Sequence, residues 1–141
     1  MKYQSGYDHR LFEPEYFELG FPLDAPILTP DIAVSIFGRM RLRAGYSWNG
    51  ANVIPDWRWI LRGSAGHDGG YQLLRLRLLP ADPWRERFDR VLQACCYEDA
   101  VTLGWPAWIA RGYADTVYQG VHLFGASAAE AASENPVLTA P

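Results

Sequence analysis

The prolines and glycines of this chain divide it into two parts that must fold differently. Within residues 20–55 there are prolines at positions 22, 26, 30 and 55 and glycines at positions 20, 38, 45 and 50. Proline removes a backbone hydrogen bond and glycine loses the most conformational freedom, so neither suits the interior of a helix. The runs between them, such as residues 33–37 and 40–46, are short and typical of strands, and in the second run apolar side chains alternate with arginines. We therefore expect an N-terminal β region.

From residue 64 onward the apolar side chains recur at helical spacing instead. His67, Tyr71, Leu74 and Leu78 lie at positions i, i+4, i+7 and i+11, which form a single helix face. This spacing predicts a first helix over residues 64–78, with Ser64 as its N-cap.

Two further helices are expected after the turn "PADPW". Asp82 is a candidate cap and Pro83 suits the first helical position, so the second helix is predicted over residues 83–102. Its buried stripe is expected to contain Phe88, Leu92 and Cys95, flanked by Val91 and Cys96. The third helix is predicted over residues 106–124, with Gly125 ending it. Because the turn between them is short, the first two helices should form an antiparallel pair.

The chain of 141 residues is long enough for one domain with a hydrophobic core. We expect a single α+β domain over residues 1–125, in which a short β region is followed by three helices. The small and polar residues 126–141 predict a flexible C-terminal tail. Cys95 and Cys96 are adjacent, so they fit neither a disulfide framework nor the spacing of a zinc site. They indicate small core residues in a reducing compartment.

Charge and hydropathy argue against several classes of protein. The net charge of −3 gives no electrostatic reason to expect a nucleic-acid partner. No apolar run approaches the roughly 18 residues that a membrane-spanning helix needs. Residues 1–16 do not have the pattern of a signal peptide. We therefore expect no nucleic-acid partner, no transmembrane segment and no signal peptide.

The stretch "GSAGHDGGYQLLR", residues 63–75, carries the candidate chemistry. Adjacent residues of a helix point about 100° apart, so His67 and Asp68 cannot share one partner. Tyr71 lies one turn beyond His67 and faces the same neighbour. The second helix carries Asp89 at the margin of its apolar stripe, where an acid is costly unless it is paired. We therefore expect His67 and Tyr71 to contact Asp89, while Asp68 faces the segment before the helix.

That preceding segment, "AGYSWNGANVIPD" over residues 44–56, is rich in glycine and short side chains. Such a loop exposes backbone carbonyls, and calcium takes about six to eight oxygen ligands, so Asp68 is a candidate calcium ligand. A histidine held by a buried aspartate accepts a proton from water, and a nearby cation stabilises the oxyanion formed from an ester. The residues thus predict a Ca²⁺-assisted ester hydrolase.

The same residues resemble the His-Asp site of phospholipases A2. "HDGGY" is similar to their His-Asp-x-x-Tyr signature, and the aspartate of "RFDR" to the one on their second, antiparallel helix. In the disulfide-poor bacterial and parvoviral members a glycine-rich loop precedes the His-Asp helix, as "GYSWNG" does here. The resemblance implies a lipid or other ester substrate, with His67 as general base, Asp89 as its orienting partner and Tyr71 as a donor to Asp89. The implied calcium ligands are Asp68 and the backbone carbonyls of Gly45, Trp48 and Gly50.

A second resemblance covers more of the chain, roughly residues 45–125. "GYSWNGANVIPD", "GSAGHDGGYQLLR", "RFDRVL" and "VYQGVHLFG" resemble a family of unknown function found in bacteriophages and prophages. Its members typically read Asp-Gly-Ala-Ser in the loop, where this chain has Asn49 and Asn52, and larger residues where it has Gly69 and Gly70. The asparagines lower the negative charge available to a cation. The resemblance implies a phage protein of the host cytoplasm or the virion.

The sequence leaves two function classes open. In the first, the cluster of His67, Asp89 and Tyr71 is catalytic. In the second, the protein is a non-enzymatic virion component, such as a tail-associated protein, or a host-interaction protein. There the cluster braces two helices and phage structural proteins are the partners. Gly69 and Gly70 either leave room for a substrate or allow a close backbone, and His122 is expected to be a packed or helix-terminal histidine.

Overall fold

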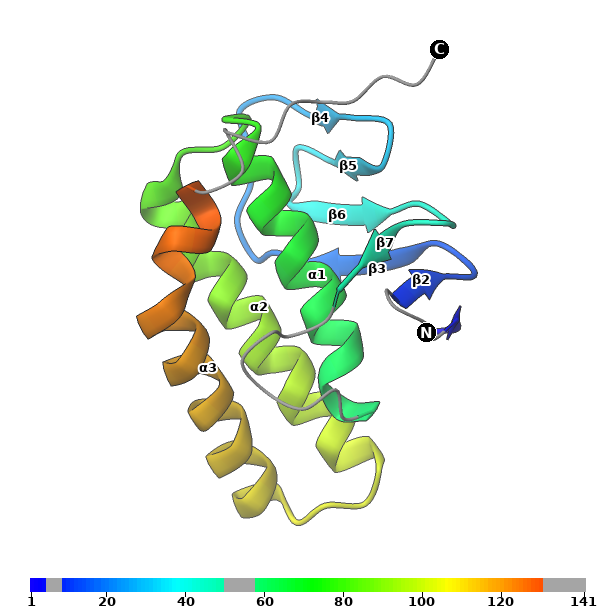
Figure 1. Ribbon diagram of the computed structural model, residues 1–141, viewed down its shortest axis with the longest axis vertical. Helices are drawn as coiled ribbons and strands as arrows, with labels where there is room; N and C mark the ends of the chain where they lie inside the picture. Colours follow the sequence, from blue (N-terminus) through cyan, green and yellow to red (C-terminus); the bar gives the residue numbers. More distant parts are fainter. Residues whose placement is uncertain (5–8, 50–57, 131–141) are drawn as a thin grey trace.

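Seven short strands and three helices make up the computed structural model, which describes residues 1–4, 9–49 and 58–130 (Figure 1). All strands precede the helices, so the predicted α+β architecture is confirmed. One antiparallel sheet has the order β1-β2-β7 and consists of β1 (Tyr3–Gln4), β2 (His9–Leu11) and β7 (Ser47–Trp48). The other, with the antiparallel order β3-β6-β5-β4, consists of β3 (Glu15–Glu18), β4 (Ile27–Leu28), β5 (Ile32–Val34) and β6 (Arg39–Leu42).

The helices are α1 (Arg58–Arg75), α2 (Ala81–Thr102) and α3 (Ala107–Glu130). Helix α1 packs against α2, and α2 packs against α3. The first two run in opposite directions, as predicted, and α1 lies between the four-stranded sheet and α2 (Figure 1). None of the described helices is long and apolar enough to cross a membrane.

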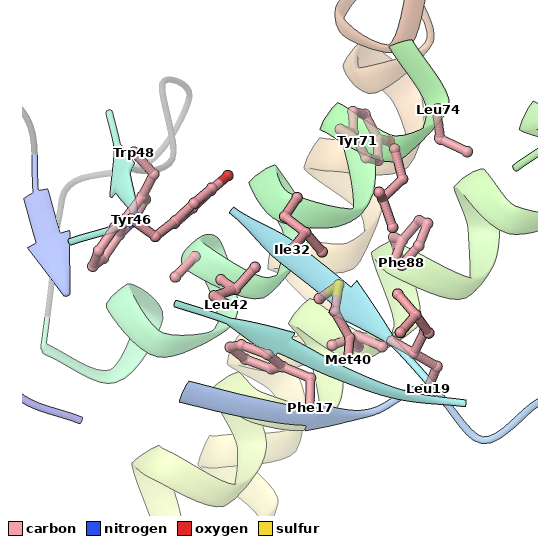
Figure 2. Packing of buried hydrophobic residues seen from close by; sticks show 14 of the residues in the cluster. Phe17, Leu19, Ile32, Met40, Leu42, Tyr46, Trp48, Tyr71, Leu74 and Phe88 are labelled. Carbon is pink, nitrogen blue, oxygen red and sulfur yellow. The ribbon is translucent and has the colours of Figure 1, made fainter. Parts of the chain in front are cut away.

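The main core lies between the four-stranded sheet and the first two helices. In β6 the buried Met40 and Leu42 alternate with the exposed Arg39 and Arg41, which is the predicted alternation. Figure 2 shows Met40 and Leu42 together with Phe88 of α2 and with Tyr71 and Leu74 of α1. Burial of one face of the sheet therefore fixes the register of β6, since a slip by one residue would bury the arginines.

Helix α1 begins six residues earlier than predicted, and the assignment of Ser64 as its N-cap is wrong. Ser64 is buried inside the helix, where its hydroxyl donates to the carbonyl of Leu61 at 2.9 Å. The same hydroxyl accepts a hydrogen bond from the indole of Trp48 at 2.9 Å. Ser64 therefore holds β7 against α1 instead of starting the helix.

Helix α1 also ends at Arg75, three residues before the predicted end. Arg77 has a φ of 56°, and its amide donates to the carbonyl of Leu74 at 3.0 Å. The amide of Leu78 donates to the carbonyl of Leu73 at 3.0 Å. These bonds form a left-handed C-terminal cap with arginine where glycine is usual, so no glycine marks the end of this helix in the sequence.

The second helix agrees closely with prediction and the third is longer. Asp82 has an extended backbone (φ −99°, ψ 121°), so regular helical geometry in α2 begins at Pro83. The predicted buried stripe is confirmed for Phe88, Val91, Leu92, Cys95 and Cys96. Helix α3 passes through Gly125, its predicted end, and continues to Glu130. Of the predicted flexible tail, residues 131–141 lie outside the described residues.

The adjacent glycines of α1 are points of close packing. A Cβ atom at Gly69 would lie 2.7 Å from Leu42 of β6, and one at Gly70 would lie 2.2 Å from Phe88 of α2. Both distances are far shorter than a carbon–carbon contact. The space beside these glycines is therefore occupied by the protein's own side chains. The absence of a side chain at the two glycines allows α1 to fit between the sheet and α2.

We expect Gly70→Ala to lower the free energy of unfolding by about 1–3 kcal/mol, because the added methyl group overpacks the contact with Phe88. Gly112→Ala is the matched control: it lies in α3, and a methyl group added there would have nothing within 4 Å. There we expect a gain of about 0.5–1 kcal/mol from helix propensity. Urea denaturation of the two variants measures both changes, and equal effects would contradict the packing role.

Candidate active site

Asp89 is the centre of a hydrogen-bonded cluster that joins all three helices. It lies on α2 and its side chain is 0% exposed. Its Oδ1 atom accepts hydrogen bonds from Nε2 of His67 at 2.8 Å and from the hydroxyl of Tyr71 at 2.7 Å. The predicted contacts of His67 and Tyr71 with Asp89 are therefore confirmed.

The spacing of His67 and Tyr71 explains how one carboxylate reaches both. They lie four residues apart on α1, so their rings lie side by side on one face, with centroids 4.1 Å apart and planes at 34°. An ionised carboxylate only accepts hydrogen bonds, so the neutral His67 ring carries its hydrogen on Nε2. Its Nδ1 atom is then the basic atom, which is the arrangement a general base requires.

His122 is a third partner of Asp89, and the sequence did not predict this contact. It lies on α3 with Nδ1 3.3 Å from Oδ2 of Asp89, and its ring stacks on that of Tyr118 (centroids 5.2 Å apart, planes at 14°). The available signal was a second Tyr–His pair four residues apart, which resembles the pair on α1. It gave no indication of which neighbour that face of α3 would meet.

The cluster changes the acidity of its members in opposite directions. Burial alone would lower the pKa of His67, but the carboxylates of Asp68 and Asp89 outweigh it and raise that pKa. Burial alone would raise the pKa of Asp89, but the hydrogen bonds from His67, Tyr71 and His122 outweigh it and lower that pKa. Burial and the bond to Asp89 raise the pKa of Tyr71, so its hydroxyl stays protonated and donates.

These shifts predict how stability depends on pH. The pKa of His67 lies above its ordinary 6.5, so its contribution is complete below that pH and is lost as pH rises through the folded-state pKa. The pKa of Asp89 lies below its ordinary 3.8, so its contribution is complete above that pH and is lost as pH falls through the folded-state pKa. We expect the cluster's contribution to the melting temperature to be greatest between about pH 4 and pH 6.5. Melting curves of the wild type minus those of Asp89→Asn isolate this contribution, and a flat difference would contradict it.

Asp68 faces the segment before α1, as predicted, and its carboxylate also lies near His67. It lines a polar surface hollow together with Tyr46, Ser47, Trp48, Asn49, Gln72 and Arg75. Its Oδ1 lies 3.9 Å from Nδ1 of His67, which is an ion-pair distance and too long for a hydrogen bond. The basic atom of His67 is therefore directed to the side on which Asp68 and the hollow lie.

Only one of the other predicted calcium ligands lies at the hollow in the part of the chain that the structure describes. Trp48 lines the hollow, and its indole bond to Ser64 holds it there. Gly45 does not line the hollow: it is the third residue of a turn closed by the amide of Tyr46 on the carbonyl of Arg43 at 3.1 Å, and its φ of 86° suits glycine. Gly50 lies outside the described residues.

The donors around the hollow fit a hard cation in type. Asp68 offers a carboxylate, Asn49 and Gln72 offer amide oxygens and Ser47 offers a hydroxyl. Oxygen atoms of these kinds are the ligands of calcium. Arg75 lines the same hollow, and its positive charge opposes a cation. Among the described residues no three His, Cys, Asp or Glu side chains gather into a metal site, so any cation here depends on neutral oxygens.

No protein family, curated protein or solved structure matches this chain.

The two cysteines take no part in the site. Both are free and buried on α2, and burial raises the pKa of the Cys95 thiol to about 12. A thiol so far from ionisation is a poor nucleophile at neutral pH. Their predicted role as core residues agrees with this position.

Proposed function

We propose that this protein is an ester hydrolase in which His67 activates water. The observation that carries the proposal is the 2.8 Å bond between Nε2 of His67 and the fully buried carboxylate of Asp89. This bond orients the ring, places the basic lone pair on Nδ1 and stabilises the ring once it is protonated. Tyr71 supports the arrangement by donating to the same oxygen of Asp89.

The reaction follows from these roles. Water attacks the ester carbonyl carbon while its proton passes to Nδ1 of His67, which becomes an imidazolium paired with Asp89. The tetrahedral intermediate then collapses, the carbon–oxygen bond to the alcohol breaks, and the alcohol takes the proton from Nδ1. His67 returns to its neutral form, so atoms and charge balance over the cycle.

Calcium is part of this proposal, and Asp68 with neighbouring oxygens of the hollow would hold it. Bound there, it would supply positive charge for the oxyanion of the intermediate. The resemblance to phospholipases A2 supports a lipid ester as substrate. The resemblance to a phage family supports a phage protein of the host cytoplasm or virion.

We expect about 10 mM calcium to raise the melting temperature by roughly 3–8 °C, which corresponds to a site with a dissociation constant of about 0.1–1 mM. Only a cation bound to the folded state stabilises in this way. Magnesium at the same concentration and the variant Asp68→Asn are the controls, and each should reduce the shift. An equal shift in Asp68→Asn would show that Asp68 is not a ligand.

The proposal is tested by hydrolysis assays on the purified chain, with short-chain nitrophenyl esters and with phospholipid vesicles. Turnover by the wild type that is lost in His67→Gln supports the proposal. Equal rates for the two proteins refute it, and so does turnover of neither substrate class by the wild type with calcium present.

A second candidate, a non-enzymatic phage protein, is favoured by one observation. The side chain of His67 is only 11% exposed, and the space beside Gly69 and Gly70 is filled by Leu42 and Phe88. A polar cluster buried this well can serve to hold helices in one arrangement. Its partners would be phage structural or host proteins, and it predicts that His67→Gln changes stability without changing any turnover.

A further inference from the structure

We propose that His122 is a positioning residue for His67 and acts through Asp89, so that α3 completes the site formed by α1 and α2. This inference rests on the proposed function. It assigns a role to a histidine that neither the His-Asp-x-x-Tyr pattern nor its spacing indicates.

The two oxygens of Asp89 are used by different helices. Oδ1 receives both donors of α1, at 2.8 Å and 2.7 Å, whereas Oδ2 receives only Nδ1 of His122 at 3.3 Å among the described residues. The terminal torsion of an aspartate is broad, so hydrogen-bond partners and not rotamer preference limit rotation of the carboxylate about its Cβ–Cγ bond. A donor on the second oxygen restricts that rotation. It therefore fixes the direction in which Oδ1 meets His67.

His122 is itself held in place by neighbours on α2 and α3. Its ring stacks on Tyr118 one turn earlier, and the guanidinium of Arg85 on α2 donates to its backbone carbonyl. Its side chain is 39% exposed, so removing it leaves no large cavity. His122 is therefore not a buried core residue whose main contribution is apolar packing.

Close approach of α3 to α1 is also built into the sequence near His122. A Cβ atom at Gly125 would lie 2.5 Å from the hydroxyl of Tyr71. Only glycine therefore lets this turn of α3 pass over the tyrosine that donates to Asp89. Helix α3 therefore contacts the cluster on two successive turns: His122 contacts Asp89, and Gly125 lies against Tyr71.

The test compares His122→Phe, which keeps an aromatic ring but has no donor, with His122→Asn, whose amide can donate from nearly the position of Nδ1. Leu123→Ala, at an exposed neighbour, is the control. We expect His122→Phe to lower kcat about 10- to 100-fold with little change in KM, as small displacements of a catalytic group do. His122→Asn should recover most of this loss, and Leu123→Ala should match the wild type.

A measurement independent of turnover separates this inference from the proposed function. The ¹⁵N chemical shifts of the His67 ring report its tautomer and hydrogen bonding in each folded variant. A changed His67 signal in His122→Phe that returns in His122→Asn supports positioning, even if the wild type hydrolyses no ester and the proposed function fails. Unchanged His67 signals, or equal loss of kcat in both variants, would overturn it.

Discussion

Asp89→Ala is expected to lower the free energy of unfolding by about 3–5 kcal/mol, the range seen when one partner of a buried polar pair is removed. The carboxylate is fully buried and accepts from His67, Tyr71 and His122. Its removal leaves two donors of α1 without their acceptor in the interior and opens a cavity between the helices. Each buried donor without a partner costs about 1–3 kcal/mol, which accounts for the size of the effect.

Urea denaturation of Asp89→Ala measures this change, with Asp115→Ala as the control. Asp115 lies on α3 and accepts an exposed hydrogen bond from Gln93 at 2.7 Å. Its removal should cost less than about 1 kcal/mol, because exposed polar contacts contribute little. A loss of similar size in both variants would mean that the cluster around Asp89 does not hold the helices together.

The order of the elements and the first half of the cluster could be predicted from local signals. Prolines and glycines confine the strands to the first part of the chain, and the alternation around Met40 and Leu42 is a local pattern with period two. His67 and Tyr71 share a face by spacing alone, and an acid beside a buried stripe requires a partner. A short connection then brings that acid to α1.

The remaining features depend on contacts between distant segments. Local sequence could not show that Ser64 lies inside the helix and is not its N-cap, because its hydrogen-bond partner, the indole of Trp48, lies on the distant strand β7. The sequence could not distinguish Gly70 from a substrate-binding glycine, because the residue that fills the space beside it, Phe88, lies on another helix. A Cβ atom at position 70 would lie 2.2 Å from Phe88. His122 required the orientation of α3 against α2, which no period in the sequence specifies.

His67→Gln is expected to lower kcat/KM for ester hydrolysis by about 10²- to 10⁴-fold, the usual contribution of a general base. Glutamine can place an amide donor near the position of Nε2 and so keep a hydrogen bond to Asp89, but it has no group that accepts a proton from water. The melting temperature should therefore stay closer to that of the wild type than in His67→Ala. Initial rates on the ester that the wild type hydrolyses fastest, together with melting curves, measure both quantities.

The comparison with Asp89→Asn decides whether charge or shape matters at the cluster. Asparagine keeps the size of the side chain and an oxygen for His67 and Tyr71, but it removes the negative charge that stabilises a protonated His67. If His67 is a base, Asp89→Asn must lose much of the turnover while it retains more stability than Asp89→Ala. If the cluster only braces helices, these substitutions change stability, and any turnover falls only as far as the folded fraction of the protein falls. A rate that falls in step with stability across His67→Gln, His67→Ala and Asp89→Asn would therefore contradict general-base catalysis.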